Sequence, residues 1–380
     1  MNPPHVVVIG AGSTGAAIAH DLALRGVRVT IVDRFGPAGG TTGHNQAQLH
    51  SGARYAVNDP VSARECIEEN RILRTIMPDA LELNDGLFIA LREDHLEYRE
   101  RFLEACARCG IPTQEITPAE ALKLEPLLNP KLLTAIRIPD GVFDPYRFTL
   151  SFLATARKNG ATFMPFVEVI DLDIKRGQVT TRSRSEGTTQ TIGCDAVINA
   201  IGPWAARLAE MAGIKIDLEP SAGVMATLDR RLCNMVINIL APPGDGDIIV
   251  PQRNTSILGT TSWLVADPDL ISIPDGHVAM LLELADWMIP GASHAKVRGV
   301  MAAARPLIKD AQGGRTASRM HRCYDHSQDD VPGFFSIIGG KTTTARHMAE
   351  DMSDMVCARL GVTNPCRTRT EQLLSHYLAG

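Results

Sequence analysis

Apolar runs interrupted by glycine give the start of the chain a strand–helix–strand pattern. Residues 5–9 are almost entirely valine and isoleucine, which predicts a buried strand. Apolar residues then recur with helical spacing over 14–25, up to a stop at Gly26, and residues 27–32 form a second apolar run. A unit of this length is typical of a parallel sheet covered by helices. The pattern therefore predicts an α/β layer at the N-terminus.

The rest of the chain mixes further helices with a long stretch of alternating strands. Helices are predicted at 61–77, 94–109, 147–158, 276–288 and 342–360, and strands at 162–181 around a turn, 197–201, 247–250, 256–259 and 334–338. Asp85-Gly86 and Asp140-Gly141, each between apolar runs, predict hairpin turns. Because α/β units occur at both ends and in the middle, two interleaved domains explain the order better than two domains in series.

Composition indicates a folded protein and excludes several classes of function. Of the 380 residues, 44% are hydrophobic and 21% are charged, close to the average of soluble domains. The 38 basic and 43 acidic side chains give a net charge of −5, so no nucleic-acid partner is expected. No run of about 18 apolar residues predicts a membrane span, and the apolar start lacks the basic residues of a signal peptide. We expect a cytoplasmic protein, with peripheral attachment at the inner face of the membrane as an open alternative.

Cys106 and Cys109 have the C-x-x-C spacing of some metal and redox sites. They fall inside the predicted helix 94–109, whereas such pairs usually lie at a turn or a helix start. No second pair follows at the spacing of a zinc site. We therefore expect packed thiols and no metal.

The segment from Gly10 to Gly15 joins the first strand to the first helix. Gly10 permits a tight turn, Gly12 lets the backbone approach a pyrophosphate, and Gly15 lets the helix and the strand pack closely. The phosphates are then expected on the free N–H groups of the helix start. Asp33 ends the second strand, where an acid accepts hydrogen bonds from a ribose hydroxyl. This combination predicts a bound dinucleotide.

Two further segments favour FAD over a nicotinamide cofactor. Residues 39–52 form a long loop rich in glycine, hydroxyls and amides, which suits a ligand that extends past its pyrophosphate to a flavin. Gly339, Gly340 and Lys341 open the last helix, and a helix start near the pyrimidine edge of a flavin stabilises the negative charge of the reduced form. A plain helix-start turn is the alternative interpretation of this second segment. Together they predict a Rossmann-like, FAD-binding domain.

Short motifs in a fixed order give nearly the whole chain, about residues 6–366, a resemblance to a known family. They lie at 49–57 (LHSGARYAV), 62–70 (SARECIEEN), 85–89, 139–141, 259–262, 305–307 and 339–341. The chain resembles the FAD-dependent glycerol-3-phosphate dehydrogenases, specifically the large catalytic subunit of the anaerobic bacterial enzyme, in the D-amino-acid oxidase-like superfamily. The resemblance implies oxidation of a phosphorylated polyol such as sn-glycerol 3-phosphate at C2, with hydride transfer to N5 of FAD. It also implies that electrons leave to a quinone or a partner protein, and a homodimer is a further open expectation.

The resemblance implies a mixed α/β fold of the D-amino-acid oxidase and glutathione reductase-2 type. A Rossmann-like FAD-binding domain would comprise residues 1–80, 145–215 and 325–380. An antiparallel-sheet substrate domain would comprise residues 81–144 and 216–324. The residues expected to contact FAD are Gly10, Gly12, Ser13, Thr14, Gly15, Asp33, Arg34, Thr42, Gly43, Asn45, Gln48, Leu49, Val169, Ala200, Gly202, Trp204, Gly339, Gly340, Lys341 and Thr342.

Basic residues stand where the family places its substrate-facing groups. A phosphate dianion is bound best by arginine, which is always charged and can donate two hydrogen bonds at once. Arg54, Arg319 and Tyr55 are accordingly expected to bind substrate. Arg305 and Lys341 would polarise the C2 oxygen or help to remove its proton, although Arg305 could instead serve a structural ion pair.

His50 is the candidate general base, because imidazole has a suitable pKa. The alternative interpretation is a residue that only lines the flavin loop.

Three departures from the family pattern bear on substrate and acceptor. Ala222 stands where the family often has lysine, and Ala345 where it usually has tyrosine, so two polar groups near the ligand are expected to be missing. This admits a larger phosphopolyol or a different hydroxy acid. The anaerobic large subunits also usually continue into a cysteine-bearing iron–sulfur-type domain that this sequence lacks, which leaves the electron acceptor open.

Two other functions fit the same residues. One is an oxidase or dehydrogenase of an amino acid or 2-hydroxy acid, in which the arginines would bind a carboxylate. The other is a non-catalytic, flavin-carrying subunit, against which the basic residues of the substrate site argue.

Overall fold

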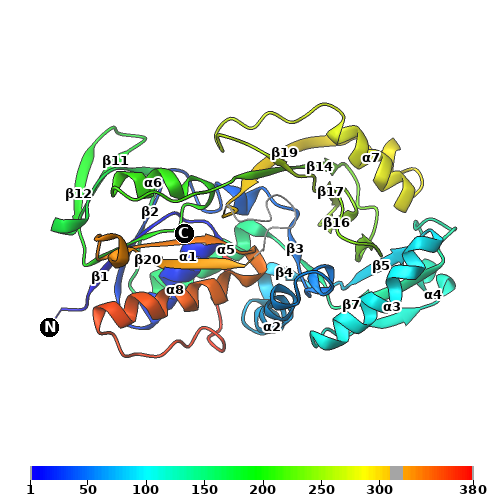
Figure 1. Ribbon diagram of the computed structural model, residues 1–380, viewed down its shortest axis with the longest axis horizontal. Coiled ribbons are helices and arrows are strands. Elements are labelled where there is room, and N and C mark those ends of the chain that lie inside the picture. The colour runs from blue at the N-terminus through cyan, green and yellow to red at the C-terminus, as the bar shows by residue number, and fades with distance from the viewer. Residues whose placement is uncertain (1, 309–319, 379–380) are drawn as a thin grey trace.

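The computed structural model describes residues 2–308 and 320–378 and contains two large sheets that lie at opposite ends of an elongated molecule (Figure 1). The first is six-stranded. Its order is β20 (His321–Asp325), β21 (Phe334–Gly339), β13 (Ala196–Asn199), β1 (His5–Ile9), β2 (Arg28–Asp33) and β9 (Thr162–Pro165). All neighbours are parallel except β20, which is antiparallel to β21 at the edge.

Both faces of this sheet are covered, which explains why its strands are almost wholly apolar. Val6 and Val8 of β1 pack on the side of three helices, α1 (Ser13–Leu24), α5 (Pro145–Lys158) and α8 (Ala345–Leu360). Val7 and Ile9 point to the opposite side, toward α6 (Ala205–Met211) and a small sheet. That small sheet consists of β10 (Val167–Asp173), β11 (Gln178–Ser183) and β12 (Thr189–Gly193). The predicted dinucleotide unit is thus the centre of a three-layer structure.

The second large sheet is nine-stranded and mostly antiparallel. Its order is β18 (Trp263–Leu264), β14 (Ser221–Leu228), β17 (Thr255–Gly259), β16 (Ile248–Gln252), β15 (Val236–Ile239), β5 (Gly86–Ala90), β7 (Thr134–Ile138) and β6 (Gln114–Ile116), and β19 (Val297–Arg305) also pairs with β14. Helix α7 (His277–Met288) packs against β14 and β17, while α3 (Glu93–Arg108) and α4 (Pro118–Leu124) contact β5 and β7. The chain crosses between the two large sheets several times, which confirms the predicted interleaved α/β architecture.

A short three-stranded sheet and α2 (Pro60–Ile76) lie where the two large sheets meet. The short sheet has the order β3 (Gln48–Leu49), β8 (Gly141–Phe143) and β4 (Leu81–Glu82). Both predicted hairpins are wrong here. Strand β8 pairs with β3 and β4 but not with β7, and β5 pairs with β7 and β15 but not with β4.

The physical reason for this correction lies in Asp140 and Asp85. The Asp140 carboxylate accepts hydrogen bonds from Ser51 N and Gln48 Nε2, both at 2.6 Å, which draws β8 to β3. Asp85 adopts a left-handed φ of 58° and its carboxylate binds Arg137 of β7 at 2.6 Å. Both aspartate–glycine pairs therefore redirect the chain from one sheet to another.

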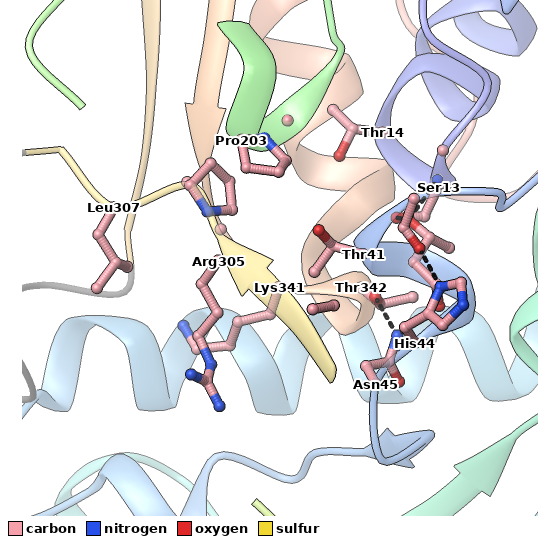
Figure 2. Close-up of a pocket in the computed structure, with 18 of the residues that line it drawn as sticks. Ser13, Thr14, Thr41, His44, Asn45, Pro203, Arg305, Leu307, Lys341 and Thr342 are labelled. Atoms are coloured by element: carbon pink, nitrogen blue, oxygen red, sulfur yellow. Dashed lines mark hydrogen bonds between the residues drawn. The ribbon is translucent and has the colours of Figure 1, made fainter. Parts of the chain in front are cut away.

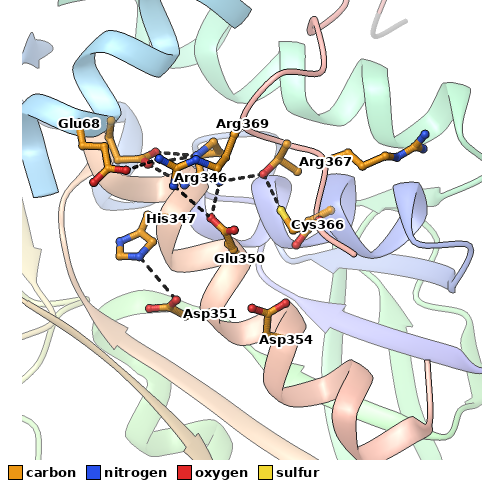
Figure 3. Close-up of polar contacts among 12 residues, drawn as sticks. Glu68, Arg346, His347, Glu350, Asp351, Asp354, Cys366, Arg367 and Arg369 are labelled. Carbon is orange, nitrogen blue, oxygen red and sulfur yellow. Dashed lines mark hydrogen bonds and ion pairs between the residues drawn. The ribbon is translucent and has the colours of Figure 1, made fainter. Parts of the chain in front are cut away.

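A buried polar network holds α8, the helix that follows the second glycine segment (Gly339, Gly340 and Lys341), in place (Figure 3). Arg346 is fully buried, and its guanidinium binds Glu69 of α2 at 2.6 Å and Glu350 at 2.7 Å. It also donates to Thr368 Oγ1 at 2.9 Å, which ties the C-terminal segment to the same helix. A charge this deeply buried requires such partners, so the network sets the position of α8 relative to α2.

Two expectations from composition can be compared with the described residues. None of the helices in residues 2–308 and 320–378 combines the length and apolar character needed to cross a membrane. The Cys106 thiol on α3 and the Cys109 thiol at the C-cap of this helix are both buried. Burial raises the pKa of Cys106 to about 12, as fits a packed thiol.

Candidate functional site

A cleft of about 1270 Å³ opens where the two large sheets approach each other. Its walls come from the start of α1, the loop 40–48, the ends of β13 and β21, and the end of β19. Figure 2 shows this wall, with Ser13, Thr14, Thr41, His44 and Asn45 on one side and Arg305, Leu307 and Lys341 on the other. The lining therefore comes from both large sheets.

The first glycine turn cannot hold side chains at two of its positions. Gly10 has a φ of +106°, and a Cβ there would lie 2.6 Å from the carbonyl oxygen of Ala200. A Cβ on Gly15 would lie 1.9 Å from the carbonyl oxygen of Gly10. These contacts are between backbone segments, so neither neighbour can move aside. The glycines let β1, β13 and α1 approach closely enough to form one wall.

The start of α1 is open toward the cleft. Gly12 is its N-cap and has no side chain, and Ser13 N donates a hydrogen bond to Thr42 Oγ1 at 3.1 Å. The positive end of the helix and its N–H groups are suited to an anion such as a pyrophosphate. Asp33 holds the turn from the other side, because its carboxylate accepts from Ala11 N and Phe35 N, both at 2.7 Å.

The polar loop after β2 is tied to the second glycine segment. Asn45 Nδ2 donates to Thr42 O at 2.6 Å and to Thr342 Oγ1 at 3.4 Å, the latter contact being drawn in Figure 2. Gly339 and Gly340 have φ values of +88° and +75°, and a Cβ on Gly340 would lie 2.3 Å from Met348 Sδ. The backbone therefore requires glycine at both positions, which a plain helix-start turn does not.

The substrate end of the cleft carries Arg54, whose guanidinium already has a strong partner. Its Nη1 and Nη2 bind the two oxygens of Asp247 at 2.9 and 2.7 Å, and Nη2 also donates to Gly244 O at 3.1 Å. Burial lowers the pKa of Arg54, but Asp247 outweighs this and the net shift is upward. The predicted phosphate contact would therefore have to use the remaining N–H groups of Arg54.

Arg305 and Lys341 lie on the same wall (Figure 2). Arg305 ends β19, and its Nη1 donates to the carbonyls of Ser221 and Ala222 at 3.3 and 3.2 Å. Its Nη2 donates to Thr260 Oγ1 at 3.0 Å, and these three partners are neutral. The Lys341 ammonium lies 4.7 Å from the centre of the Tyr55 ring, a distance typical of a cation–π contact.

His50 lines the cleft beside these cations and packs against Tyr55, with ring centres 5.4 Å apart. Burial, together with the charges of Lys341 and Arg54, lowers the pKa of His50 to about 3. The imidazole is therefore neutral at physiological pH and can accept a proton. The same charges oppose keeping that proton unless an anion enters the cleft.

The structure gathers nearly all the predicted site residues around this one cleft. Of those it describes, Gly15, Gly43 and Leu49 lie outside the lining, whereas Gly10, Gly12, Ser13, Thr14, Asp33, Arg34, Thr42, Asn45, Gln48, His50, Arg54, Tyr55, Val169, Ala200, Gly202, Trp204, Arg305, Gly339, Gly340, Lys341 and Thr342 line it. Arg319 lies outside the described residues. Leu49 is buried in β3 and Gly15 is covered by Gly10, so both shape the wall from behind.

Several residues of the site were not predicted from the sequence. Asp247 binds Arg54 from 193 positions away, and Asp269 binds Arg34 from 235 positions away. Arg322 and Thr260 also line the cleft. Thr260 belongs to the motif at 259–262, but no local pattern marks Asp247, Asp269 or Arg322, because their role depends on contacts between distant segments.

The two alanines that depart from the family pattern do not face the cleft. Ala222 is fully buried in β14 between Gly223 and Ser221, and the cleft is lined by the alternate positions Gly223 and Met225. Ala345 is fully buried at the start of α8. Ala222 thus points away from the cleft because successive strand residues face opposite sides of the sheet, and neither alanine is part of the cleft lining.

The lining fits an extended dinucleotide with a flavin. Glycines without room for a Cβ let the backbone itself form the edge of the cleft at Gly10 and at Gly339. The start of α1, whose N-cap Gly12 has no side chain, lies between the Asp33 end and the loop 40–48, in the order in which ribose, pyrophosphate and flavin follow one another.

Comparisons with known proteins agree with this geometry. The sequence profile of the FAD dependent oxidoreductase family matches residues 5–346. The chain is 40% identical to the A1 subunit of the anaerobic glycerol-3-phosphate dehydrogenase of Haloferax volcanii, over 97% of this chain and 66% of that protein. It is also 40% identical to the A subunit of the corresponding enzyme of Escherichia coli strain K12, over 96% of this chain and 68% of that protein. The chain thus spans about two thirds of the length of these curated relatives.

A solved structure shows the same fold. The glycerol-3-phosphate dehydrogenase of Bacillus halodurans, complexed with FAD, superimposes with a TM-score of 0.74 at 24% identity, over 98% of this chain and 68% of that chain. The predicted fold class and the predicted FAD cofactor are both confirmed. This chain therefore belongs to the family of FAD-dependent oxidoreductases and, within it, to the family of the anaerobic glycerol-3-phosphate dehydrogenase A subunits.

Proposed function

We propose that this protein oxidises sn-glycerol 3-phosphate, or a closely related phosphopolyol, at C2 and passes the hydride to N5 of FAD. The observation that carries the proposal is the gathering of Arg54, Arg305, Lys341 and Arg322 in the cleft, beside the glycine segments expected to hold the flavin. The relatives at 40% identity support the same substrate. The positive charge and the family thus point to one class of ligand, a small phosphate ester.

The phosphate would be held by arginine, with the substrate carbon facing the flavin. Arg54 contributes the N–H groups that Asp247 and Gly244 leave free. Because Asp247 already holds the guanidinium in place, binding of the phosphate does not require further ordering of the Arg54 side chain. Arg319, which we also propose as a phosphate ligand, lies outside the described residues. Tyr55, between His50 and Lys341, shapes the space for the polyol carbons.

Oxidation of a secondary alcohol requires loss of the hydroxyl proton and of a hydride. Bound FAD supplies the hydride acceptor. His50 is neutral, because burial and two nearby cations depress its pKa to about 3, and it can accept the hydroxyl proton. Entry of a phosphate dianion offsets these cations and raises the affinity of the imidazole for a proton. Arg305 and Lys341 would stabilise the developing negative charge on the C2 oxygen.

We propose that the chain is divided as the sequence suggests. The FAD-binding domain comprises residues 1–80, 145–215 and 325–380, and the substrate domain residues 81–144 and 216–324. The membership of the two large sheets supports most of this division, although β20 at 321–325 pairs with the first sheet. We further propose that the electrons pass to a quinone or a partner protein. The proposed location is the cytoplasm. If the electron acceptor is a quinone, the protein would have to attach to the inner face of the membrane.

The substrate can be tested by steady-state reduction of an artificial electron acceptor. sn-Glycerol 3-phosphate should be oxidised efficiently, whereas glycerol, which lacks the phosphate, should show a kcat/KM at least about a hundredfold lower. Glycine and a 2-hydroxy acid serve as probes of the second candidate function, in which the same arginines bind a carboxylate. Preference for either of these over the phosphate ester would contradict the proposal.

A further inference from the structure

The segment between β18 and α7 leaves the nine-stranded sheet and reaches the other end of the cleft. We call residues 265–276 the strap. It begins where Val265 N donates to Pro220 O at 3.0 Å, and it turns back where Leu270 N donates to Asp267 O at 3.1 Å. Figure 1 shows this stretch running from the region of α6 back to α7. The strap therefore connects the sheet of one proposed domain with the surface of the other.

Asp269 is the point at which the strap is attached. Its carboxylate accepts hydrogen bonds from Arg34 Nη2 at 2.9 Å, Trp204 Nε1 at 2.8 Å and Arg207 Nη1 at 2.5 Å. The other terminal nitrogen of Arg207 binds Asp267 of the same strap at 2.5 Å. Three donors from two separate parts of the chain, the end of β2 and the start of α6, thus converge on one carboxylate.

All three donors belong to residues that line the cleft, at the end marked by Asp33. Arg34 directly follows Asp33, and its guanidinium lies 4.8 Å from the ring centre of Phe35 and 4.5 Å from that of Trp204. Trp204 in turn packs over Gly40, where a Cβ would lie 3.1 Å from its ring. The attachment therefore joins the end of β2, the start of α6 and the loop 36–40 over the part of the cleft expected to hold adenosine.

We propose that Asp269 latches the strap over the adenosine end of the cleft and thereby slows the release of FAD. A single exposed ion pair contributes little to stability. Here, two charge-assisted hydrogen bonds and the indole N–H act on one carboxylate, and the two aromatic rings already hold Arg34 in place. Opening of this end requires all three contacts to break together, so the latch acts on the rate at which bound FAD leaves.

The test compares Asp269→Ala and Asp269→Asn with Asp275→Asn. Asp275 is an exposed acid of the same strap that forms no ion pair among residues 2–308 and 320–378, so it matches the loss of charge without the latch. Release of FAD is measured as the recovery of flavin fluorescence after dilution of the flavin-loaded protein. We expect Asp269→Ala to release FAD about tenfold faster, because the three contacts of the carboxylate are lost together but are partly exposed to solvent, and Asp275→Asn to match the parent protein.

Salt and a second variant complete the experiment. About 1 M NaCl should accelerate release from the parent protein but add little to Asp269→Ala, because screening weakens only the charged contacts. Arg207→Met removes the ion pairs with both Asp267 and Asp269 but leaves Arg34 and Trp204 on Asp269, so it should accelerate release less than Asp269→Ala, and it gives the answer if the Asp269 variants do not fold. Release that is unchanged or slower in Asp269→Ala and Arg207→Met, or equally fast in Asp275→Asn, would overturn the proposal. No substrate is needed, so this result is separate from that of the proposed reaction.

Discussion

Replacing Gly12 by alanine should separate cofactor binding from folding. Gly12 has a φ of −71° and a ψ of 178°, an extended conformation that alanine adopts readily. Its Cβ would meet only Thr42, at 3.1 Å from Oγ1 and 4.0 Å from Cβ. The new methyl group would therefore leave the backbone in place and stand at the edge of the cleft, where the pyrophosphate is expected to approach the start of α1.

The two effects can be estimated separately. A Gly→Ala change at a compatible position stabilises the folded protein by about 0.4–1 kcal/mol, because it reduces the conformational entropy of the unfolded chain. The close contact of the new methyl group with Thr42 offsets a similar amount. The free energy of unfolding of the flavin-free protein should thus change by less than about 1 kcal/mol. A pyrophosphate displaced from two N–H groups loses about 3 kcal/mol, which raises the Kd for FAD on the order of a hundredfold.

Two other glycines provide the comparison. Gly10 has a φ of +106°, and the Cβ of an alanine there would lie 2.6 Å from a carbonyl oxygen. Gly10→Ala should therefore lower the free energy of unfolding by about 3 kcal/mol and also weaken the binding of FAD. Gly213→Ala has a similar positive φ of +77° with no atom within 4 Å, and should cost about 1 kcal/mol without affecting FAD. Urea unfolding of the flavin-free proteins and FAD titration followed by tryptophan fluorescence measure both quantities. A parent-like Kd for Gly12→Ala, or a loss of stability as large as for Gly10→Ala, would refute the reasoning.

Two further predictions concern charged residues. Arg54→Lys should raise the KM for sn-glycerol 3-phosphate about tenfold with a smaller change in kcat, whereas an unchanged KM would leave Arg54 only its ion pair with Asp247. Burial opposes the charged form of His321, but the hydrogen bond of its Nε2 with Asp351 at 2.8 Å and the Glu65 carboxylate, 3.5 Å from its Nδ1, outweigh this and raise its pKa to about 9. The resulting stability is present below the unfolded pKa of about 6.5 and is lost as the pH rises through about 9. Urea unfolding should therefore show the parent losing about 2 kcal/mol more than His321→Gln between about pH 6.5 and 9.5, and parallel profiles would contradict this.

Local patterns were sufficient for the dinucleotide unit. The run from His5 to Ile9, the glycines at 10, 12 and 15 and the acid at 33 act over fewer than about 30 residues, which is the size of one β-α-β unit. Their positions in the structure follow from backbone geometry that only glycine permits. The second glycine segment is similar, because two consecutive left-handed residues at Gly339 and Gly340 leave little choice of side chain.

Other features depend on which distant segments meet and could not be predicted locally. The sequence places an arginine at 54 but does not show that its guanidinium forms an ion pair with Asp247. The aspartate–glycine pairs at 85 and 140 indicate sharp turns, but not that the strands on either side join different sheets. Ala222 was expected near the ligand, and a shift of one residue in strand register decides that it faces the core instead.

The most direct test of the proposed function is a single turnover under anaerobic conditions. The flavin-loaded protein is mixed with sn-glycerol 3-phosphate, and the visible absorbance of the oxidised flavin is followed with time. We expect rapid and complete bleaching by this substrate, with a rate that saturates as its concentration rises. Bleaching only by an amino acid or a 2-hydroxy acid would contradict the phosphopolyol assignment, and a flavin that no candidate substrate reduces would indicate a flavin-carrying subunit without its own catalysis.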